Sequence, residues 1–85
     1  MKKIKVFYME GCPHCKKAFK IIDGLKANPK YSNIEIEYID ENKEVKIASA
    51  HDYYYVPTLY VDGVKLHEGV PTEEKIENAF KEAIK

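Results

Sequence analysis

Hydrophobic and polar residues alternate at the start of the chain, over residues 3–8. Ile4, Val6 and Tyr8 fall on one face of an extended segment. Phe7 makes the opposite face apolar as well, near the end of the segment. A strand that is buried on both faces at this end is therefore predicted.

A helical spacing replaces the alternation from residue 13 onward. Apolar residues recur at steps of three and four, which is typical of a helix with one buried face. Pro13 suits the first helical position, where no backbone N–H is required. Because Asn28 and Pro29 interrupt the pattern, the helix is expected to run to about Leu25. The inward stripe is Ala18, Phe19, Ile22 and Leu25.

The next two elements are predicted between residues 33 and 50. Isoleucines alternate with glutamates over residues 33–40, which indicates a second strand with one wetter face. Asp40 can then cap a short helix that runs to Ala50. Since a helix joins the first two strands, they should be parallel, with a right-handed crossover.

A hairpin and a final helix complete the predicted order. Asp62-Gly63 lies between two apolar strands within residues 57–69 and suits a tight hairpin turn. Thr72 can cap the last helix, and the acidic residues of its first turn suit the helix dipole. The inward stripe of this helix is Ile76, Ala79, Phe80 and Ala83. We expect one α/β domain over residues 1–85, in the order β-α-β-α-β-β-α, with a four-stranded mixed sheet and three helices.

Charge and composition narrow the possible functions. The chain has 14 Lys and Arg residues against 14 Asp and Glu residues, which argues against nucleic acid as a main partner. No stretch approaches the roughly 20 apolar residues needed to cross a membrane. The first residues contain lysines, but Lys5 interrupts the apolar run of an export signal, so a cytoplasmic location is expected. In that compartment, a close cysteine pair is more often catalytic or metal-binding than structural.

Cys12 and Cys15 are the only cysteines, and they stand at the start of the predicted first helix. Residues three apart share a helix face, so the two thiols can approach bonding distance. Cys12 should face the unpaired amides of the first turn, which stabilise a thiolate. Cys15 should lie deeper, where burial keeps it protonated. We therefore expect Cys12 to attack a disulfide and Cys15 to resolve the resulting mixed disulfide.

The histidines leave two questions open. A protonated His14 would tune the reactivity of Cys12 modestly, and a solvated position at the helix start is the alternative. Zinc also uses C-x-x-C, but a tetrahedral site needs four ligands. His51 and His67 fall in unrelated segments and are expected at the surface, His51 alternatively as a partner for a helix C-terminus. No metal site is therefore expected.

Three motifs together resemble the thioredoxin/glutaredoxin superfamily: CPHC at a strand-to-helix junction, YVPTLYVDG, and EGVPTEEKIENAF near the end. The length and element order resemble its smallest members, glutaredoxin-sized thioredoxin-like proteins. The resemblance implies a thioredoxin fold, with Cys12 as the exposed nucleophile and Cys15 as the resolving thiol. Pro13 and His14 complete the active-site motif. The Cys12–Cys15 disulfide would be the redox group, with no other cofactor.

The same resemblance implies a substrate-binding loop. Pro57 would be cis, and the backbone of Val56 would pair with an extended substrate segment. Without the resemblance, Pro57 would be interpreted as a proline at a strand start. Thr58 after the proline is thioredoxin-like, and one tyrosine, such as Tyr55, could line the groove. Gly69 opens a segment that resembles the entry to the last thioredoxin helix.

Several residues depart from the family patterns. Met9 replaces the basic residue that helps glutaredoxins hold glutathione, and His67-Glu68 stand where glutaredoxins have glycines. Gly11 replaces the tryptophan that precedes the first cysteine of thioredoxins. Val6 occupies the position of their buried acid, so another acceptor, such as water, must take the proton of the resolving thiol.

Three functions follow from these residues. The first is a small, monomeric dithiol–disulfide oxidoreductase that reduces disulfide-containing proteins and is recharged by a flavin-dependent thioredoxin reductase. The second is a glutathione-dependent glutaredoxin, which Met9 disfavours. The third is a metal-binding chaperone with a Met-x-Cys-x-x-Cys loop, but Met9 is one position too far from Cys12.

Overall fold

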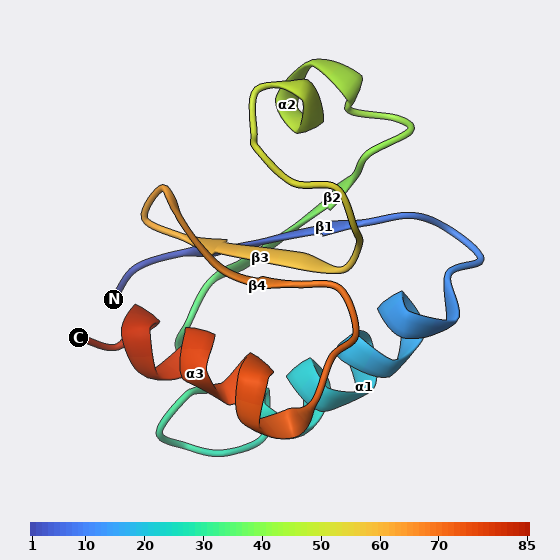
Figure 1. The fold of residues 1–85 in the computed structure, drawn as a ribbon. Helices are drawn as coiled ribbons and strands as arrows, with labels where there is room; N and C mark the ends of the chain where they lie inside the picture. Colours follow the sequence, from blue (N-terminus) through green and yellow to red (C-terminus); the bar gives the residue numbers. More distant parts are fainter.

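The computed structural model describes residues 1–85 as a four-stranded sheet with helices on both faces. Two longer helices cover one face, and one short helix lies over the other (Figure 1). The strands are β1 (Ile4–Tyr8), β2 (Ile36–Asp40), β3 (Thr58–Val61) and β4 (Val64–Glu68). The helices are α1 (Pro13–Lys26), α2 (Val45–Ser49) and α3 (Glu73–Ala83). The predicted β-α-β-α-β-β-α order and α/β class are confirmed.

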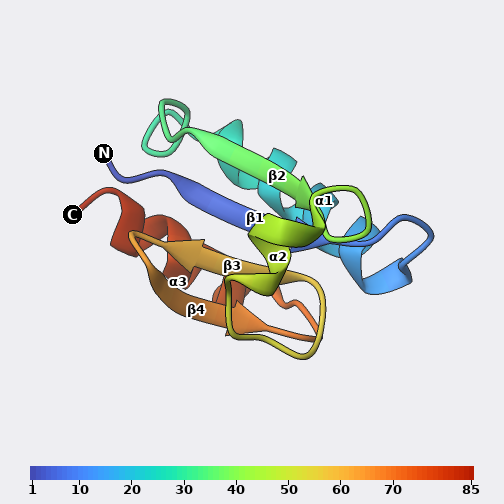
Figure 2. The same ribbon diagram turned by 90° about the horizontal axis from the view of Figure 1, so that it is seen from above.

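The strands lie in the order β2-β1-β3-β4, so β1 and β3 are central (Figure 2). β1 runs parallel to β2 and antiparallel to β3, which makes the sheet mixed as predicted. β3 and β4 form the predicted hairpin. Asp62 and Gly63 have φ angles of 52° and 80°, the left-handed backbone that a tight hairpin turn requires.

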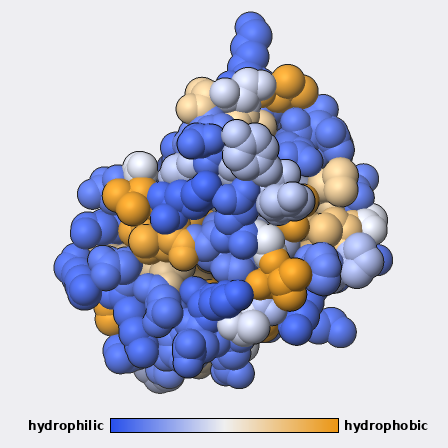
Figure 3. Space-filling model, viewed as in Figure 1, coloured by the Kyte–Doolittle hydropathy of each residue, from blue (hydrophilic) through white to orange (hydrophobic).

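The two faces of the sheet are packed differently. Twelve buried residues form one cluster between the sheet and the pair α1 and α3. On the α2 side, only Phe7, Ile39 and Tyr60 form a buried cluster, and α2 itself contributes no buried residue. On the view of Figure 3, hydrophobic residues occur in separate patches among hydrophilic ones. None of the helices has the length and apolar character needed to span a membrane.

Three sequence predictions about local structure need correction. β2 begins at Ile36 rather than Asn33, although Ile34 is fully buried. The N-cap of α2 is Glu44 rather than Asp40, whose carbonyl and carboxylate oxygens instead accept hydrogen bonds within the turn before the helix. Phe19 packs against the core cluster as its place in the stripe predicted, but it is only half-buried, and its ring also packs edge-to-face against Tyr8 and Tyr38.

The two longer helices begin where the sequence predicted. Thr72 caps α3, and its hydroxyl accepts a hydrogen bond from the Lys75 amide at 3.2 Å. α1 begins with Pro13 directly after its N-cap, Cys12. This start of α1 lies beside the beginning of β3 and the end of β4 (Figures 1 and 2). The fold therefore brings the cysteine pair and the predicted substrate loop to one end of the sheet.

Candidate active site

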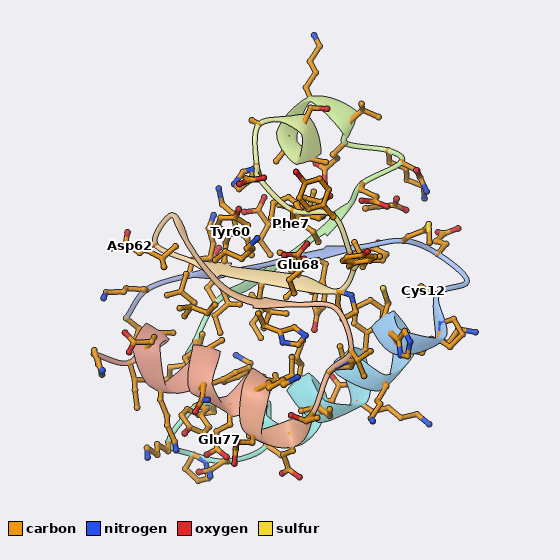
Figure 4. All side chains as sticks on the ribbon, viewed as in Figure 1. Phe7, Cys12, Tyr60, Asp62, Glu68 and Glu77 are labelled. Carbon is orange, nitrogen blue, oxygen red and sulfur yellow. The ribbon has the colours of Figure 1, made fainter.

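The side chain of Cys12 folds back over the first turn of α1. Its Sγ accepts a hydrogen bond from the backbone N–H of Cys15 at 3.3 Å, the contact expected of an N-cap residue. This contact holds the Cys12 sulfur over the first turn of α1. It also leaves Cys12 only 8% exposed, contrary to the freely exposed nucleophile that the resemblance implied. Figure 4 labels Cys12 at this end of the molecule.

Cys15 is only 1% exposed. Burial raises the pKa of its thiol to about 12, and a hydrogen bond with the Cys12 side chain acts in the same direction. The backbone of Met9 opposes this rise by hydrogen bonding to the sulfur. Since both cysteines are free, the structure describes a dithiol whose inner member stays protonated at neutral pH.

Pro57 follows a cis peptide bond, as the resemblance implied. Two contacts fix its surroundings: the Gly69 amide donates to the Pro57 carbonyl at 3.0 Å, and the Thr58 hydroxyl donates to the Tyr55 carbonyl at 2.5 Å. Thr58 is fully buried, whereas 69% of Tyr55 is exposed. Gly69 has a φ of 90°, a conformation that glycine adopts without strain.

Val56 differs from its neighbours because its backbone makes no hydrogen bond within the chain. Its side chain is half-buried against the cluster of Phe7, Ile39 and Tyr60. The N–H and C=O groups of Val56 are therefore free to pair with another extended segment.

The histidines do not join the cysteines. His14 is exposed, and its ring makes no hydrogen bond. The Nδ1–H of His51 donates to the Ile47 carbonyl at 2.8 Å, the helix C-terminal contact that the sequence suggested. His67 was predicted at the surface, and this prediction is wrong. It is 6% exposed, its Nε2 lies 2.9 Å from the Gly69 carbonyl, and burial lowers its pKa.

A bulge in the hairpin explains the burial of His67. Leu59 pairs with His67 and Tyr60 pairs with Lys65, so Leu66 is the extra residue. Leu66 and His67 consequently both face the helices α1 and α3. No group of three or more His, Cys, Asp or Glu side chains in the structure could hold a metal ion.

Sequence reasoning missed the contribution of Glu68, which it treated only as a departure from the glutaredoxin pattern. The Glu68 carboxylate accepts hydrogen bonds from the amides of Tyr54 and Tyr55, just before the cis-proline. An acidic residue next to Gly69 was the available signal. The partners lie 13 and 14 residues away, so the sequence alone could not pair them.

The chain belongs to the thioredoxin family, because the family model described as a thioredoxin domain matches residues 2–81. It is 30% identical over 82 residues to a thioredoxin of Methanocaldococcus jannaschii, covering 96% of this chain and 95% of that protein. It is 29% identical to a probable thioredoxin of Methanothermobacter marburgensis, with the same coverage of each chain.

Solved thioredoxin structures share the fold. A variant of the thioredoxin from Halobacterium salinarum superposes with a TM-score of 0.74 at 22% identity, covering 99% of this chain and 75% of that one. The thioredoxin of Malassezia sympodialis gives a TM-score of 0.78 at 18% identity, covering 96% and 74%. Family and fold together define a thioredoxin-like disulfide oxidoreductase.

Proposed function

We propose that this chain reduces disulfides of other proteins by thiol–disulfide exchange through Cys12 and Cys15. The observation that carries the proposal is the hydrogen bond from the Cys15 amide to Cys12 Sγ, at the same end of the sheet as the unpaired backbone of Val56. Pro13 starts the helix that supplies this amide, and Thr58 and Gly69 support the loop that contains Val56. No resident cofactor is required.

The exchange proceeds in two steps that move two electrons. The Cys12 thiolate attacks one sulfur of the substrate disulfide, forms a mixed disulfide and releases the other substrate sulfur as a thiolate. Cys15 then loses its proton, attacks Cys12 Sγ and releases the second substrate thiolate. The substrate is reduced to a dithiol, and Cys12 and Cys15 are oxidised to a disulfide. Because Val6 stands in place of an acid, water takes the proton of Cys15.

None of the hollows of the structure is lined by either cysteine. An extended segment on either side of the substrate cysteine would pair with the N–H and C=O groups of Val56. The exposed ring of Tyr55 stands next to this position. This arrangement suits a protein disulfide better than a small enclosed ligand.

A flavin-dependent thioredoxin reductase is the proposed electron donor, since the chain lacks the basic residue with which glutaredoxins hold glutathione. Position 9 is Met9, which is 38% exposed and uncharged. His14, which is exposed beside Cys12, would add a modest cationic influence when protonated.

Insulin reduction by the pre-reduced chain tests the proposal. The unchanged chain should reduce insulin, whereas Cys12→Ser should lose at least about a thousandfold in rate, as expected when a nucleophile is removed. The oxidised chain should be reduced slowly by glutathione and fast by a thioredoxin reductase. Fast reduction by glutathione would favour the glutaredoxin alternative, and an active Cys12→Ser variant would overturn the proposal.

A further inference from the structure

The loop of residues 50–57 contains no helix or strand, and side chains of the hairpin hold it in place. The Tyr60 hydroxyl accepts from the Asp52 amide at 3.1 Å and donates to the Asp52 carbonyl at 2.7 Å. Nearer to the cis-proline, Glu68 is the anchor. Tyr53 and Val56 also pack against the cluster of Phe7, Ile39 and Tyr60, so polar contacts and apolar packing together hold the loop.

Both carboxylate oxygens of Glu68 have partners. Oε2 accepts from the amides of Tyr54 and Tyr55 at 2.5 and 3.0 Å, and Oε1 pairs with Lys65 Nζ at 2.7 Å. Successive amides that converge on one oxygen form an anion-binding turn. These partners, Lys65 first, lower the pKa of Glu68 to about 2, so the carboxylate is ionised at neutral pH.

The hairpin bulge aims Glu68 at the loop. In a regular strand, residues three apart point to opposite faces. The extra residue Leu66 reverses this relation, so Lys65 and Glu68 lie on the same face and form an ion pair. Figure 4 shows Glu68 on the side of the sheet that carries Phe7 and Tyr60. The carboxylate therefore lies beneath the residues that precede Val56.

Glu68 binds backbone N–H groups of two loop residues and leaves the backbone of the next residue without a partner. The amides of Tyr54 and Tyr55 are bound to Glu68, whereas the N–H and C=O groups of Val56, the next residue, have no partner. Tyr54 and Tyr55 are 85% and 69% exposed, so their rings make few contacts that could hold the loop. Without Glu68, the amides of Tyr54 and Tyr55 would lose their partner, and the Thr58 hydroxyl on the Tyr55 carbonyl would be the remaining hydrogen bond just before Val56.

We propose that Glu68 is a positioning residue for substrate recognition, which holds the loop so that Val56 presents its backbone to an extended segment of a disulfide-containing protein. This inference rests on the function proposed above. Glu68 acts through the loop and touches neither cysteine, so it should affect the binding of a protein substrate and leave the chemistry of the dithiol unchanged.

Single-turnover kinetics of the pre-reduced chain test the inference. With insulin as the substrate, Glu68→Ala should raise the half-saturating concentration about tenfold, the effect of losing roughly one charge-assisted hydrogen bond. The limiting rate should stay within about twofold. The rate with the small disulfide dithiobis(nitrobenzoate), which has no extended backbone, should be unchanged. An unchanged half-saturating concentration, or an equal loss with both disulfides, would overturn the inference.

Two further variants test whether Glu68 acts by accepting hydrogen bonds from the loop amides or through its negative charge. Glu68→Gln retains an acceptor oxygen and should restore most of the insulin affinity. Glu82→Ala is the matched control, because Glu82 forms an ion pair with Lys85 at 2.8 Å, also three residues apart, but binds no loop amide. This control should leave insulin kinetics unchanged. Equal losses in Glu82→Ala and Glu68→Ala would contradict a specific role for Glu68.

Amide hydrogen exchange distinguishes failure of the inference from failure of the proposed function. Exchange at Tyr54 and Tyr55 should be faster in Glu68→Ala, and unchanged exchange there would overturn the anchoring role of Glu68 whatever the activity. If the unchanged chain reacts with dithiobis(nitrobenzoate) but never with insulin, the proposed function fails instead, and substrate positioning by Glu68 fails with it.

Discussion

The two faces of the sheet hold their elements by different means. Between the sheet and the helices α1 and α3, twelve buried residues pack as one cluster. On the α2 side, three buried residues support a loop that is held by hydroxyl and carboxylate groups. The stabilisation from apolar burial scales with the buried area and does not depend on orientation. Hydrogen bonds, in contrast, fix the orientation of peptide groups. The first face therefore provides stability and carries the cysteines on α1, and the second sets the geometry of the loop before Pro57.

The largest effect is expected on the α1 and α3 face. Phe80 is fully buried there and packs edge-to-face against Tyr31, with ring centroids 5.3 Å apart. Phe80→Ala should lower the free energy of unfolding by about 3–5 kcal/mol, through lost burial and a cavity. Urea denaturation measures this loss. Activity per folded molecule should not change, and a large change would mean that the two faces are not separate in function.

The free energy of unfolding of the reduced chain should fall as the pH rises above 9, because of the Cys15 thiol. Below pH 9 the thiol is protonated in both the folded and the unfolded chain. Between pH 9 and about 12 it ionises only in the unfolded chain, since burial raises its folded pKa from 9.0 to about 12. Unfolding is thus favoured by about 1.4 kcal/mol for each pH unit in this window. Cys15→Ala should have the smaller alkaline slope in urea titrations, and equal slopes would contradict the raised pKa.

A pair of hydroxyl deletions compares the two faces directly. Tyr60→Phe removes both hydrogen bonds to Asp52, and Tyr31→Phe removes the hydrogen bond to Glu77 at 2.9 Å on the other face. Each should cost about 1–2 kcal/mol in urea unfolding. Only Tyr60→Phe should also raise the half-saturating insulin concentration. If Tyr31→Phe raises it equally, the hydroxyl of Tyr60 has no special role at the site.

The smallest effects are expected at the helix N-caps. Thr72→Ala removes the cap of α3 and should cost about 1 kcal/mol. Glu44→Ala changes the N-cap of α2, which makes no side-chain capping hydrogen bond, so the loss should be close to zero. Thermal unfolding of the two variants measures the difference. Equal losses would mean that α2 contributes as much stability as α3.

Local patterns predicted most of the fold. The alternation in β1, the helical spacing in α1 and the tight hairpin turn at Asp62-Gly63 depend on neighbouring residues, and all were predicted. The burial of His67 could not be, because the bulge at Leu66 reverses the expected alternation. The cap of α2 was missed because Asp40 is used within the preceding turn.

The candidate site was predicted only in part. Cysteine spacing and the position at the start of the first helix located Cys12 and Cys15, and the resemblance located Pro57. The low exposure of Cys12 follows from its hydrogen bond to the Cys15 amide, a detail that spacing does not give. The contacts of Glu68 and Tyr60 join residues that only the folded hairpin brings to the loop.

The separate roles of the two cysteines, Cys12 as the nucleophile and Cys15 as the resolving thiol, are tested most directly by trapping the mixed disulfide. Cys15→Ser keeps the Cys12 thiol and the amide that donates to it, but it removes the thiol that would resolve the intermediate. Mass spectrometry after mixing with insulin should find this variant joined to an insulin chain through Cys12, and Cys12→Ser should give no adduct. Equal adducts from both variants, or an adduct only through Cys15, would contradict the account.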